Sequence, residues 1–452
     1  MKTTSVRFAL SVLALAFIAV FQLPNLGNAG TPPASTIAFV DVTVLPMDSE
    51  RTLANHTVIV KGERIAEVGP ASSVSIPADA RRIEGSGKFL IPGLAEMHGH
   101  NPALGSPPEM FERVFFLFVA NGVTTVRSML GFPGQLEWRE KARRGDFIAP
   151  NLYLAGPSFT GSGPDATRTT QQAIDRVRAQ KTEGWDLLKV HPGLKLEVYD
   201  AMAKTAKEVG MEFSGHIPAA VGLVRAIERG QTTVDHLDGY IEHLNARNAP
   251  IDPNALDAIV RKTRDSHTWV VPTMVLWETI LGSAELDELV AFPELQYMPR
   301  QMVENWKTIY DRKVSAWTFN ARQAKRIAAN RKVLLKALAD GGVNIIFGTD
   351  APQQFSVPGF SIHREMRAMQ EAGMSNFAIL QSATKNVGDY CKERDTFGTV
   401  AAGQRADLVL LNGNPIQDLG NVAQRAGVMV RRKWIAEPEI QARLAKIAEA
   451  SK

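Results

Sequence analysis

Short apolar runs bounded by turn residues mark both ends of the chain as β-strand regions, and in one of them, residues 56–60, apolar and polar positions alternate. Near the start, the expected strands are residues 36–45, 56–60, 65–68 and 89–91, with a turn at 61–64. Near the end, residues 406–411 and 428–430 repeat the pattern, with a turn at 412–415. Two β-rich ends around a different middle predict one small β-sandwich domain assembled from residues 35–90 and 395–435.

The middle of the chain alternates short apolar runs with stretches of helical spacing. Eight strands are expected, one ending at His98 and the others at residues 124–128, 151–155, 187–190, 212–216, 232–236, 269–275 and 344–349. Between them, apolar residues recur three and four positions apart, as in amphipathic helices. This alternation predicts an α/β fold of the (β/α)₈ TIM-barrel type over residues 91–394. A doubly wound open sheet is the competing architecture, but no Gly-x-Gly-x-x-Gly turn follows the first strand.

Residues 278–317, between the seventh and eighth expected strands, are too many for a single crossover helix. Their apolar and aromatic side chains predict a partly helical insertion at the catalytic rim of the barrel. Two interpretations stay open, a lid over the site and a structural extension that packs against a neighbouring segment or a second subunit.

The first 29 residues have the pattern of a secretory signal peptide. Lys2 and Arg7 precede an apolar run at residues 8–21, and the small residues Gly27 and Ala29 follow it. The alternative is an uncleaved membrane anchor, but the run is too short to span a bilayer. The sequence therefore predicts a secreted protein, with the bacterial periplasm as the expected compartment.

Composition is that of an ordinary globular protein, with 452 residues, 45% hydrophobic and 22% charged. Removing Lys2 and Arg7 from the 51 basic residues leaves 49 against 47 acidic ones, so the chain after residue 29 is nearly neutral. No dense basic patch appears, which argues against a nucleic-acid partner. Cys391 is the only cysteine, so an intramolecular disulfide is impossible.

Residues of metal-ligand type stand at the ends of the expected barrel strands, where such barrels gather their catalytic groups. His98 and His100 are two positions apart, so in a strand they face the same way. The later candidates are Lys189, His216, His236 and Asp350, on the fourth, fifth, sixth and eighth strands. Each alone has a structural explanation, such as a salt-bridged lysine or a helix-capping aspartate. Together, six such residues on five strands indicate a metal site, and imidazole and carboxylate groups suit Zn²⁺ or a similar ion.

The order His-x-His, Lys, His, His, Asp on these strands resembles the amidohydrolase superfamily in its binuclear form. Three phrases around it match as well: Phe-Leu-Ile-Pro-Gly-Leu at residues 89–94, Gly-Thr-Asp-Ala at 348–351 and Gly-Thr-Val-Ala-Ala-Gly-Gln-Arg-Ala-Asp-Leu-Val at 398–409. The resemblance covers nearly the whole chain after the predicted signal peptide. Within the superfamily, the chain most resembles imidazolonepropionase-like and metallo-dipeptidase-like secreted members.

The resemblance implies two divalent metal ions, with zinc expected and manganese, cobalt or iron as alternatives. It implies that Lys189 reacts with carbon dioxide to form a carbamate that bridges the ions, which a lowered ammonium pKa would favour. The implied ligands are His98, His100 and Asp350 for one ion and His216 and His236 for the other. A hydroxide between the ions would attack the substrate, and Asp350 would carry the proton to the departing nitrogen.

Weaker candidates lie on the same rim. His191 faces the same way as Lys189 on its strand and is a candidate substrate contact, with a structural role as the alternative. Tyr240 and His363 are further candidates for contacting the substrate, with structural roles equally open. Arg364 could pair with a substrate carboxylate, although a surface ion pair is the commoner outcome.

One departure from the dipeptidase relatives limits what can be transferred. Those relatives tend to carry a histidine in a Gly-Gly-His turn after the third strand, where this chain has Phe-Thr-Gly-Ser-Gly-Pro at residues 159–164. The details by which they polarise a carbonyl and bind a carboxylate therefore do not carry over to this sequence.

Three functions are weighed. The first is a secreted metal-dependent amidohydrolase that cleaves an amide or peptide-type C–N bond of a small molecule, with N-acyl amino acids or dipeptides as the leading substrates. The second is an ester, lactone or phosphotriester hydrolase with the same site, and the third is a non-catalytic binding protein. An adenosine-type deaminase is disfavoured, because those relatives use one metal and a helix-borne glutamate that this sequence does not place. Stable membrane insertion is not expected, and a homo-oligomer remains open.

Overall fold

The computed structural model describes residues 36–103, 105–316 and 321–452. The predicted signal peptide, residues 1–29, lies outside the described residues. Within the described part of the chain, no helix combines the length and the apolar character needed to cross a lipid bilayer.

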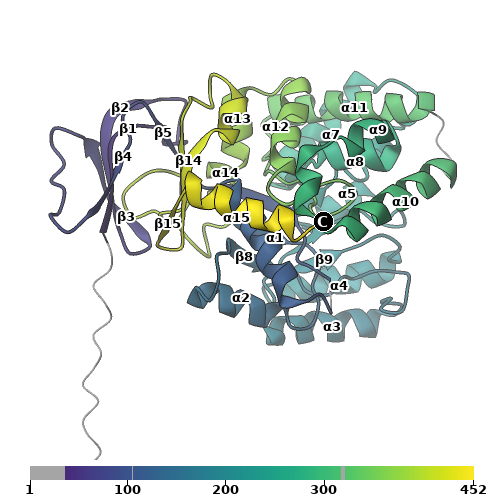
Figure 1. The fold of residues 1–452 in the computed structure, drawn as a ribbon. Helices are drawn as coiled ribbons and strands as arrows, with labels where there is room; N and C mark the ends of the chain where they lie inside the picture. The colour runs from purple at the N-terminus through teal and green to yellow at the C-terminus, as the bar shows by residue number, and fades with distance from the viewer. Residues whose placement is uncertain (1–35, 104, 317–320) are drawn as a thin grey trace, which may run out of the picture. The chain divides into compact units, whose positions relative to one another are not determined.

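Both ends of the described chain contribute to one eight-stranded sheet with the order β15-β14-β13-β5-β1-β2-β3, in which β4 also pairs with β1. The strands are β1 (Thr36–Val44), β2 (Leu53–Lys61), β3 (Arg64–Pro70), β4 (Arg81–Glu84), β5 (Phe89–Pro92), β13 (Leu408–Leu411), β14 (Arg425–Val430) and β15 (Lys433–Ala436). The two ends meet where β5 and β13 pair antiparallel, with Ile91 opposite Val409. Figure 1 shows the purple N-terminal strands beside the yellow C-terminal ones. The predicted sheet from both termini is thus confirmed, while its exact domain boundaries stay a prediction.

Apolar side chains from both termini hold these strands together in one core. Phe39, Val58 and Leu90 from the first strands pack with Leu408 and Met429 from the last, in one apolar cluster. The predicted turn after β2 is a two-residue connection to β3, in which Gly62 has a φ of 61°, a left-handed conformation that glycine adopts without strain.

The middle of the chain forms two parallel sheets, β6-β7-β8 and β12-β11-β10-β9. Their strands are β6 (Leu94–Gly99), β7 (Val123–Ser128), β8 (Asn151–Leu154), β9 (Leu188–Val190), β10 (Phe213–Gly215), β11 (Thr233–Asp235) and β12 (Trp269–Val271). Neighbouring strands follow the order of the sequence, without the reversal of order that defines a doubly wound sheet. The α/β class is confirmed together with a sheet-rich part from both termini.

The eighth expected strand, residues 344–349, is present as an extended segment rather than as a named strand. It makes an isolated parallel bridge between Ile345 and Val270 of β12. On its other side, the backbone amide of Met97 in β6 donates to the carbonyl of Phe347 over 2.8 Å. Between the two sheets, Ala155 after β8 bridges to Leu187 before β9. Every neighbouring pair in this series is therefore joined by backbone contacts.

The seventh strand is shorter than predicted: it ends at Val271, and residues 272–275 do not continue it. Pro272 has no backbone N–H to donate to the sheet, and Thr273 has a φ of 42°. Helix α8 begins at Met274. The prediction of a strand up to residue 275 is wrong because the chain turns into a helix there.

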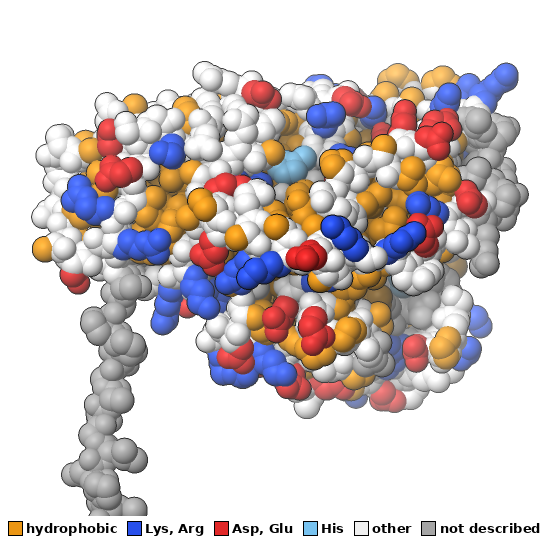
Figure 2. All heavy atoms as spheres, in the orientation of Figure 1, with side chains coloured by type: hydrophobic (Ala, Val, Ile, Leu, Met, Phe, Trp, Pro, Cys, Tyr) orange, Lys and Arg blue, Asp and Glu red, His pale blue; other side chains and the backbone are white. Residues whose placement is uncertain are grey.

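Helices connect the parallel strands, as the apolar spacing predicts. They are α1 (Pro108–Ala120), α2 (Gln135–Arg144), α3 (Thr170–Glu183), α4 (Leu196–Glu208), α5 (Leu223–Glu228), α6 (Tyr240–His243), α7 (Pro253–Asp265), α8 (Met274–Leu281), α9 (Leu286–Val290), α10 (Arg300–Ala316), α11 (Ala321–Asp340), α12 (Ser361–Glu371), α13 (Asn376–Ser382), α14 (Lys385–Tyr390) and α15 (Glu437–Glu449), with 3₁₀ turns η1 (Pro293–Tyr297) and η2 (Leu419–Ala423). Within residues 278–316, the end of α8 with α9, η1 and α10 forms the partly helical insertion, and α10 packs on α8 and α9. On the face in Figure 2, acidic and basic side chains are interspersed.

Candidate metal centre

All six predicted ligands line one cavity of about 300 Å³. His98 lies in β6 and Lys189 in β9, whereas the other four stand just after the strand or extended segment that positions them: His100, His216, His236 and Asp350. Because parallel strands bring their carboxyl ends to one edge, residues scattered over some 250 positions meet here.

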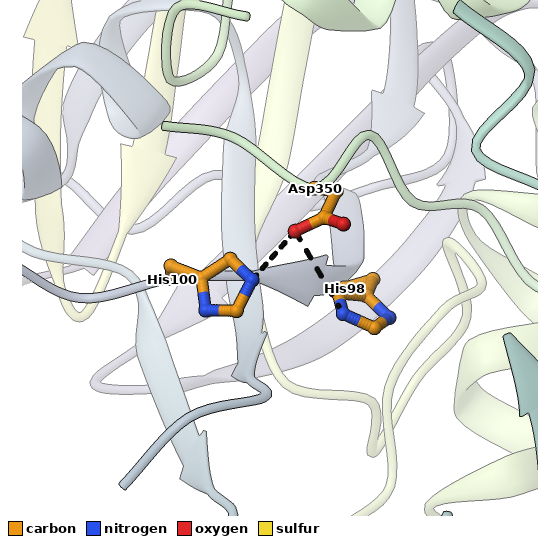
Figure 3. Close-up of side chains that lie close together, drawn as sticks. All are labelled: His98, His100 and Asp350. Atoms are coloured by element: carbon orange, nitrogen blue, oxygen red, sulfur yellow. Dashed lines mark hydrogen bonds and ion pairs between the residues drawn. The ribbon is translucent and has the colours of Figure 1, made fainter. Parts of the chain in front are cut away.

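Asp350 stands at the centre of the cluster. Its Oδ1 lies 2.5 Å from Nε2 of His100 and 3.8 Å from Nε2 of His98, as the dashed lines in Figure 3 mark. Its other oxygen, Oδ2, is 3.7 Å from Nε2 of His236. The potential ligand atoms of His98, His100 and Asp350 all lie within 4.8 Å of one another, close enough to share one ion.

The other half of the cluster surrounds Lys189. Its Nζ lies 3.1 Å from Nε2 of His98, and the side chain is 2% exposed. Burial lowers the pKa of the Lys189 ammonium, although nearby carboxylates such as Asp235 partly oppose the shift. The ring of His236 has its centre 4.3 Å from that of His98 and 4.6 Å from that of His216.

Three side chains that the sequence reasoning missed lie against the Nδ1 atoms of His98, His216 and His236, on the ring edge away from Nε2. Nδ1 of His98 lies 2.7 Å from a carboxylate oxygen of Asp235, and Nδ1 of His216 lies 2.6 Å from Asp238. Nδ1 of His236 is 2.8 Å from the hydroxyl of Thr273. When a partner occupies Nδ1, the Nε2 atom is left free for a ligand role.

The missed aspartates had a signal in the sequence. Residues 234–238 read Val-Asp-His-Leu-Asp, so both carboxylates flank His236 along the chain. Asp235 is fully buried and faces the guanidinium of Arg127, 3.4 Å away. Arg127 is itself fully buried and donates from Nε to the carbonyl of Met97 over 2.6 Å. The arginine thus supplies the positive charge that a buried aspartate needs.

Glu96 ties the first strand to the segment that carries Asp350. Its carboxylate accepts from the amide of His98 over 3.0 Å and from the amide and hydroxyl of Thr349 over 2.8 Å and 2.6 Å. Burial raises the pKa of Glu96 to about 7, an effect that these hydrogen bonds oppose. The buried carboxyl sets the separation between the histidine pair and Asp350.

The donor chemistry of the cluster fits divalent metal. Burial lowers the pKa values of His98 and His236 well below the ordinary histidine value, so both imidazoles are neutral and keep a lone pair. Among the described residues, Nε2 of His236 has no hydrogen-bond partner although it is buried. Neutral imidazoles beside a carboxylate are the ligand set that first-row divalent ions prefer.

The rest of the cavity is mostly apolar. His191 lines it, with its ring centre 4.9 Å from that of His216, so its predicted substrate role stays open. Burial lowers the pKa of His191 to about 4. The remaining lining residues are Met129, Leu130, Leu276, Trp277, Ile280, Gln353 and Gln354. Ile280 brings the start of the 278–317 insertion to the cavity, while the lid and the extension both remain predictions.

The structure does not bring the other weak candidates to the cavity. Tyr240 is fully buried and its hydroxyl lies 2.9 Å from that of Thr263. His363 has its Nε2 3.4 Å from the side-chain oxygen of Asn121, and burial lowers its pKa to about 4. Arg364 forms an ion pair with Glu294 and donates to the carbonyl of Phe355. The contacts of all three side chains are those of structural residues, which was the alternative to a substrate role.

Two solved structures with hydrolase names have the same fold. An Xaa-Pro dipeptidase with bound methionine has a TM-score of 0.67 and 21% identity, covering 89% of this chain and 100% of that one. A bottromycin amidohydrolase has a TM-score of 0.73 and 22% identity, covering 92% of this chain and 90% of that one. At such identity these similarities establish the fold alone.

Sequence comparison finds one similarity that covers a small part of the chain and one that covers most of it. An adenine deaminase from Ruegeria sp. (strain TM1040) is 28% identical over 149 residues, which are 31% of this chain and 24% of that protein. This chain thus spans about a quarter of the length of the curated relatives it matches. The broad match is to the family model described as the amidohydrolase family, which covers residues 89–438, from β5 through the parallel strands to the start of α15. With agreement over that much of its length, the chain belongs to the amidohydrolase family.

Proposed function

We propose that the protein is a binuclear metal-dependent hydrolase that cleaves an amide or peptide-type C–N bond. The observation that supports this most is the convergence of six ligand-type side chains from five strand ends on one buried cavity. Family membership supports a metal-dependent C–N hydrolase independently of that geometry. The number of ions and the substrate belong to the proposal.

In the proposed centre, His98, His100 and Asp350 would hold one ion, His216 and His236 would hold the second, and Lys189, as a carbamate, would be a ligand shared by both. Zinc is the expected ion, with manganese, cobalt or iron as alternatives. When bound, such ions act as Lewis acids toward the substrate carbonyl and make water acidic enough to attack at neutral pH. The lowered pKa of buried Lys189 supports the bridge, because only the neutral amine reacts with carbon dioxide.

Asp350 is proposed to move the proton. Its carboxylate lies within 3.8 Å of three imidazoles, is almost fully buried and lines the cavity, so it would lie beside a water and a substrate bound there. It accepts the proton of the water during attack and donates it to the departing nitrogen. A neutral amine then leaves instead of an amide anion, which is far less stable in water.

N-acyl amino acids and dipeptides are the first substrates to test. Lactones, esters and phosphotriesters form the alternative class, since the same nucleophile attacks any polarised centre. Adenine is a third test compound because of the partial similarity to adenine deaminases. The same zinc- or manganese-loaded protein should be assayed on all of these classes. Fast turnover of esters with no amide hydrolysis would overturn the amide assignment.

The Asp350→Asn variant tests the mechanism directly. We expect it to retain much of its metal but to lose about 10²- to 10⁴-fold in kcat, because the proton carrier is gone. Asp340→Asn, on the exposed end of α11, is the matched control and should behave as the wild type. Near-normal turnover of Asp350→Asn would refute the assigned role.

Two structural proposals accompany the function. We propose that the two parallel sheets and residues 344–349 form one closed (β/α)₈ barrel, supported by the backbone contacts that join each neighbouring pair. We also propose export to the periplasm, supported by the sequence pattern of residues 1–29. Mass spectrometry of protein recovered from the periplasm should give a chain that begins near residue 30.

A further inference from the structure

A second cavity of about 300 Å³, apart from the candidate metal centre, is lined mainly by arginines and by residues that pair with them. It lies where β8, the end of α2 and the turn between β14 and β15 meet (Figure 1). Asn151 beside it is the first residue of β8, whereas the metal-ligand candidates stand near the carboxyl ends of the parallel strands. Among the described residues, the two cavities share no lining residue. This arginine cavity takes its name from five side chains: Arg64, Arg143, Arg405, Arg431 and Arg432.

The carboxylates that line the arginine cavity do not neutralise it. Asp395 accepts from Arg64 over 3.0 Å and also pairs with Arg405. Nε of Arg405 donates to Asp407 over 2.7 Å. Glu63 is the third lining carboxylate. Five arginines against three carboxylates leave an excess of two positive charges among the described lining residues.

Three of the arginines keep much of their surface open to solvent, so a ligand can reach them. The side chains of Arg64, Arg143 and Arg432 are 50%, 66% and 61% exposed. Arg143 lies 3.3 Å from Glu140, which is exposed and outside the cavity. Arg432 lies 3.2 Å from Glu63, which is also exposed. Such exposed pairs contribute little to stability and give way to a more highly charged partner at low cost.

Arg431 is half-buried without an ion pair. Its guanidinium donates to the side-chain oxygen of Asn151 over 3.2 Å, and it pairs with no carboxylate among the described residues. Burial lowers the pKa of Arg431, although Asp407 and Glu63 partly oppose the shift. Both of those carboxylates are paired with other arginines. A guanidinium that has lost part of its water without gaining an anion is well suited to bind one.

The backbone that carries two of these arginines is unusual. Arg431 and Arg432 form the two-residue turn between β14 and β15, in which Val430 pairs with Lys433. Both arginines are left-handed, with φ of 48° and 68°. A hairpin turn with two left-handed residues favours Asn-Gly, because a long side chain carries a steric cost there. Two arginines at such positions indicate that their side chains serve something other than the turn itself.

We propose that the arginine cavity is a second binding site, which takes the phosphate group of a small soluble molecule. Planar guanidinium groups bind phosphate oxygens through paired, charge-assisted hydrogen bonds. A phosphate monoester carries nearly two negative charges at neutral pH, which matches the excess of positive charge, whereas a carboxylate carries one. A volume of about 300 Å³ is at the lower end for small-molecule sites, so the ligand is small. The inference does not rest on the proposed hydrolase function.

The test is a calorimetric titration of the full-length, zinc-loaded protein at neutral pH. Methyl phosphate is the probe, and acetate at the same ionic strength is the carboxylate control. We expect methyl phosphate to bind at least about tenfold more tightly than acetate. No binding of methyl phosphate, or equal affinity for acetate, overturns the inference. Because the proposed metal ions also attract phosphate, variants of the arginine cavity decide where the probe binds.

Replacing the turn separates ligand binding from a structural role. Arg431→Asn combined with Arg432→Gly removes two guanidinium groups and gives the turn the residues that it favours. We expect methyl phosphate affinity to fall at least about tenfold, while the melting temperature stays the same or rises. Arg178→Gln, on the exposed side of α3, is the matched control and should change neither. Unchanged affinity in the double variant shows binding elsewhere, such as at the metal centre, and overturns the inference. A lower melting temperature shows that the arginines stabilise the fold and overturns it as well.

A second variant keeps the turn intact. Arg143→Gln, near the end of α2, removes one exposed cation from the arginine cavity, so it tests the site even if the double variant does not fold. It should weaken methyl phosphate binding about two- to fivefold relative to Arg178→Gln. The same affinity in both single variants would exclude Arg143 from the site and overturn the inference as stated.

Discussion

Replacing Asp235 by asparagine should weaken metal binding although Asp235 is not a proposed ligand. The carboxylate is fully buried, and one oxygen lies 2.7 Å from Nδ1 of His98. This contact lacks the alignment of a hydrogen bond, but the negative charge of the carboxylate at this distance favours the tautomer of His98 with the proton on Nδ1 and a free lone pair on Nε2. An asparagine NH₂ turned to the same nitrogen would favour the opposite tautomer, in which Nε2 carries the proton and cannot bind metal.

The size of the effect follows from these contacts. Loss of such a supporting partner typically costs about 10- to 100-fold in metal affinity, or about 1.4–2.8 kcal/mol. Folding should suffer too, because the other carboxylate oxygen lies 3.4 Å from the buried guanidinium of Arg127. Breaking a buried ion pair by removing one charge costs about 3–5 kcal/mol, since the remaining charge stays buried without compensation.

Zinc titration against a competing chelator, with apo protein, measures the affinity. Asp200→Asn is the control, because Asp200 pairs with Arg225 and Arg229 away from the cavity and is partly exposed. It should bind zinc as the wild type does. Asp238→Asn, whose carboxylate is less buried and holds His216, should weaken zinc binding with a smaller loss of stability. Unchanged zinc affinity in a folded Asp235→Asn protein would refute the tautomer argument.

Three further predictions concern Lys189, the buried carboxyl group of Glu365 and the proposed metal ions. Lys189→Ala should lose at least about 10²-fold in kcat/KM, and a small carboxylic acid such as acetate should partly restore it; full activity without any additive would remove Lys189 from the proposed mechanism. Burial raises the pKa of Glu365 from 4.5 to about 8, so between these values the folded state holds the extra proton and the free energy of unfolding falls as pH rises, by up to about 1.4 kcal/mol per pH unit. Glu365→Gln should flatten this slope in denaturant titrations at pH 5, 6 and 7, and an equally steep slope would show that another group is responsible. Removing metal with a chelator should lower the melting temperature in scanning calorimetry, and restoring zinc should reverse the change, because ions that bind only the folded state stabilise it.

Much of the fold could be predicted because local patterns carry it. The alternation of strands and helical spacing indicates the α/β class, and two β-rich termini indicate a shared sheet. Strands β4 and β15 were not predicted: β4 reads Arg-Arg-Ile-Glu and β15 reads Lys-Trp-Ile-Ala, too short and too polar for a clear alternation. Such strands form because a neighbouring strand offers unpaired backbone groups, which is a property of the assembled sheet.

The candidate site likewise has one part that the sequence predicts and another that only the tertiary structure reveals. The sequence by itself determined which residue types end the parallel strands and in which order, because strand ends and ligand chemistry are both local. Only the tertiary structure decided that Asp235 and Arg127, over 100 positions apart, lie behind His98, and that Tyr240 points to Thr263 instead of the cavity. The physical reason is that burial and pairing depend on how distant segments cross. A chain pattern specifies which face of an element is apolar, but not which side chain of another element that face meets.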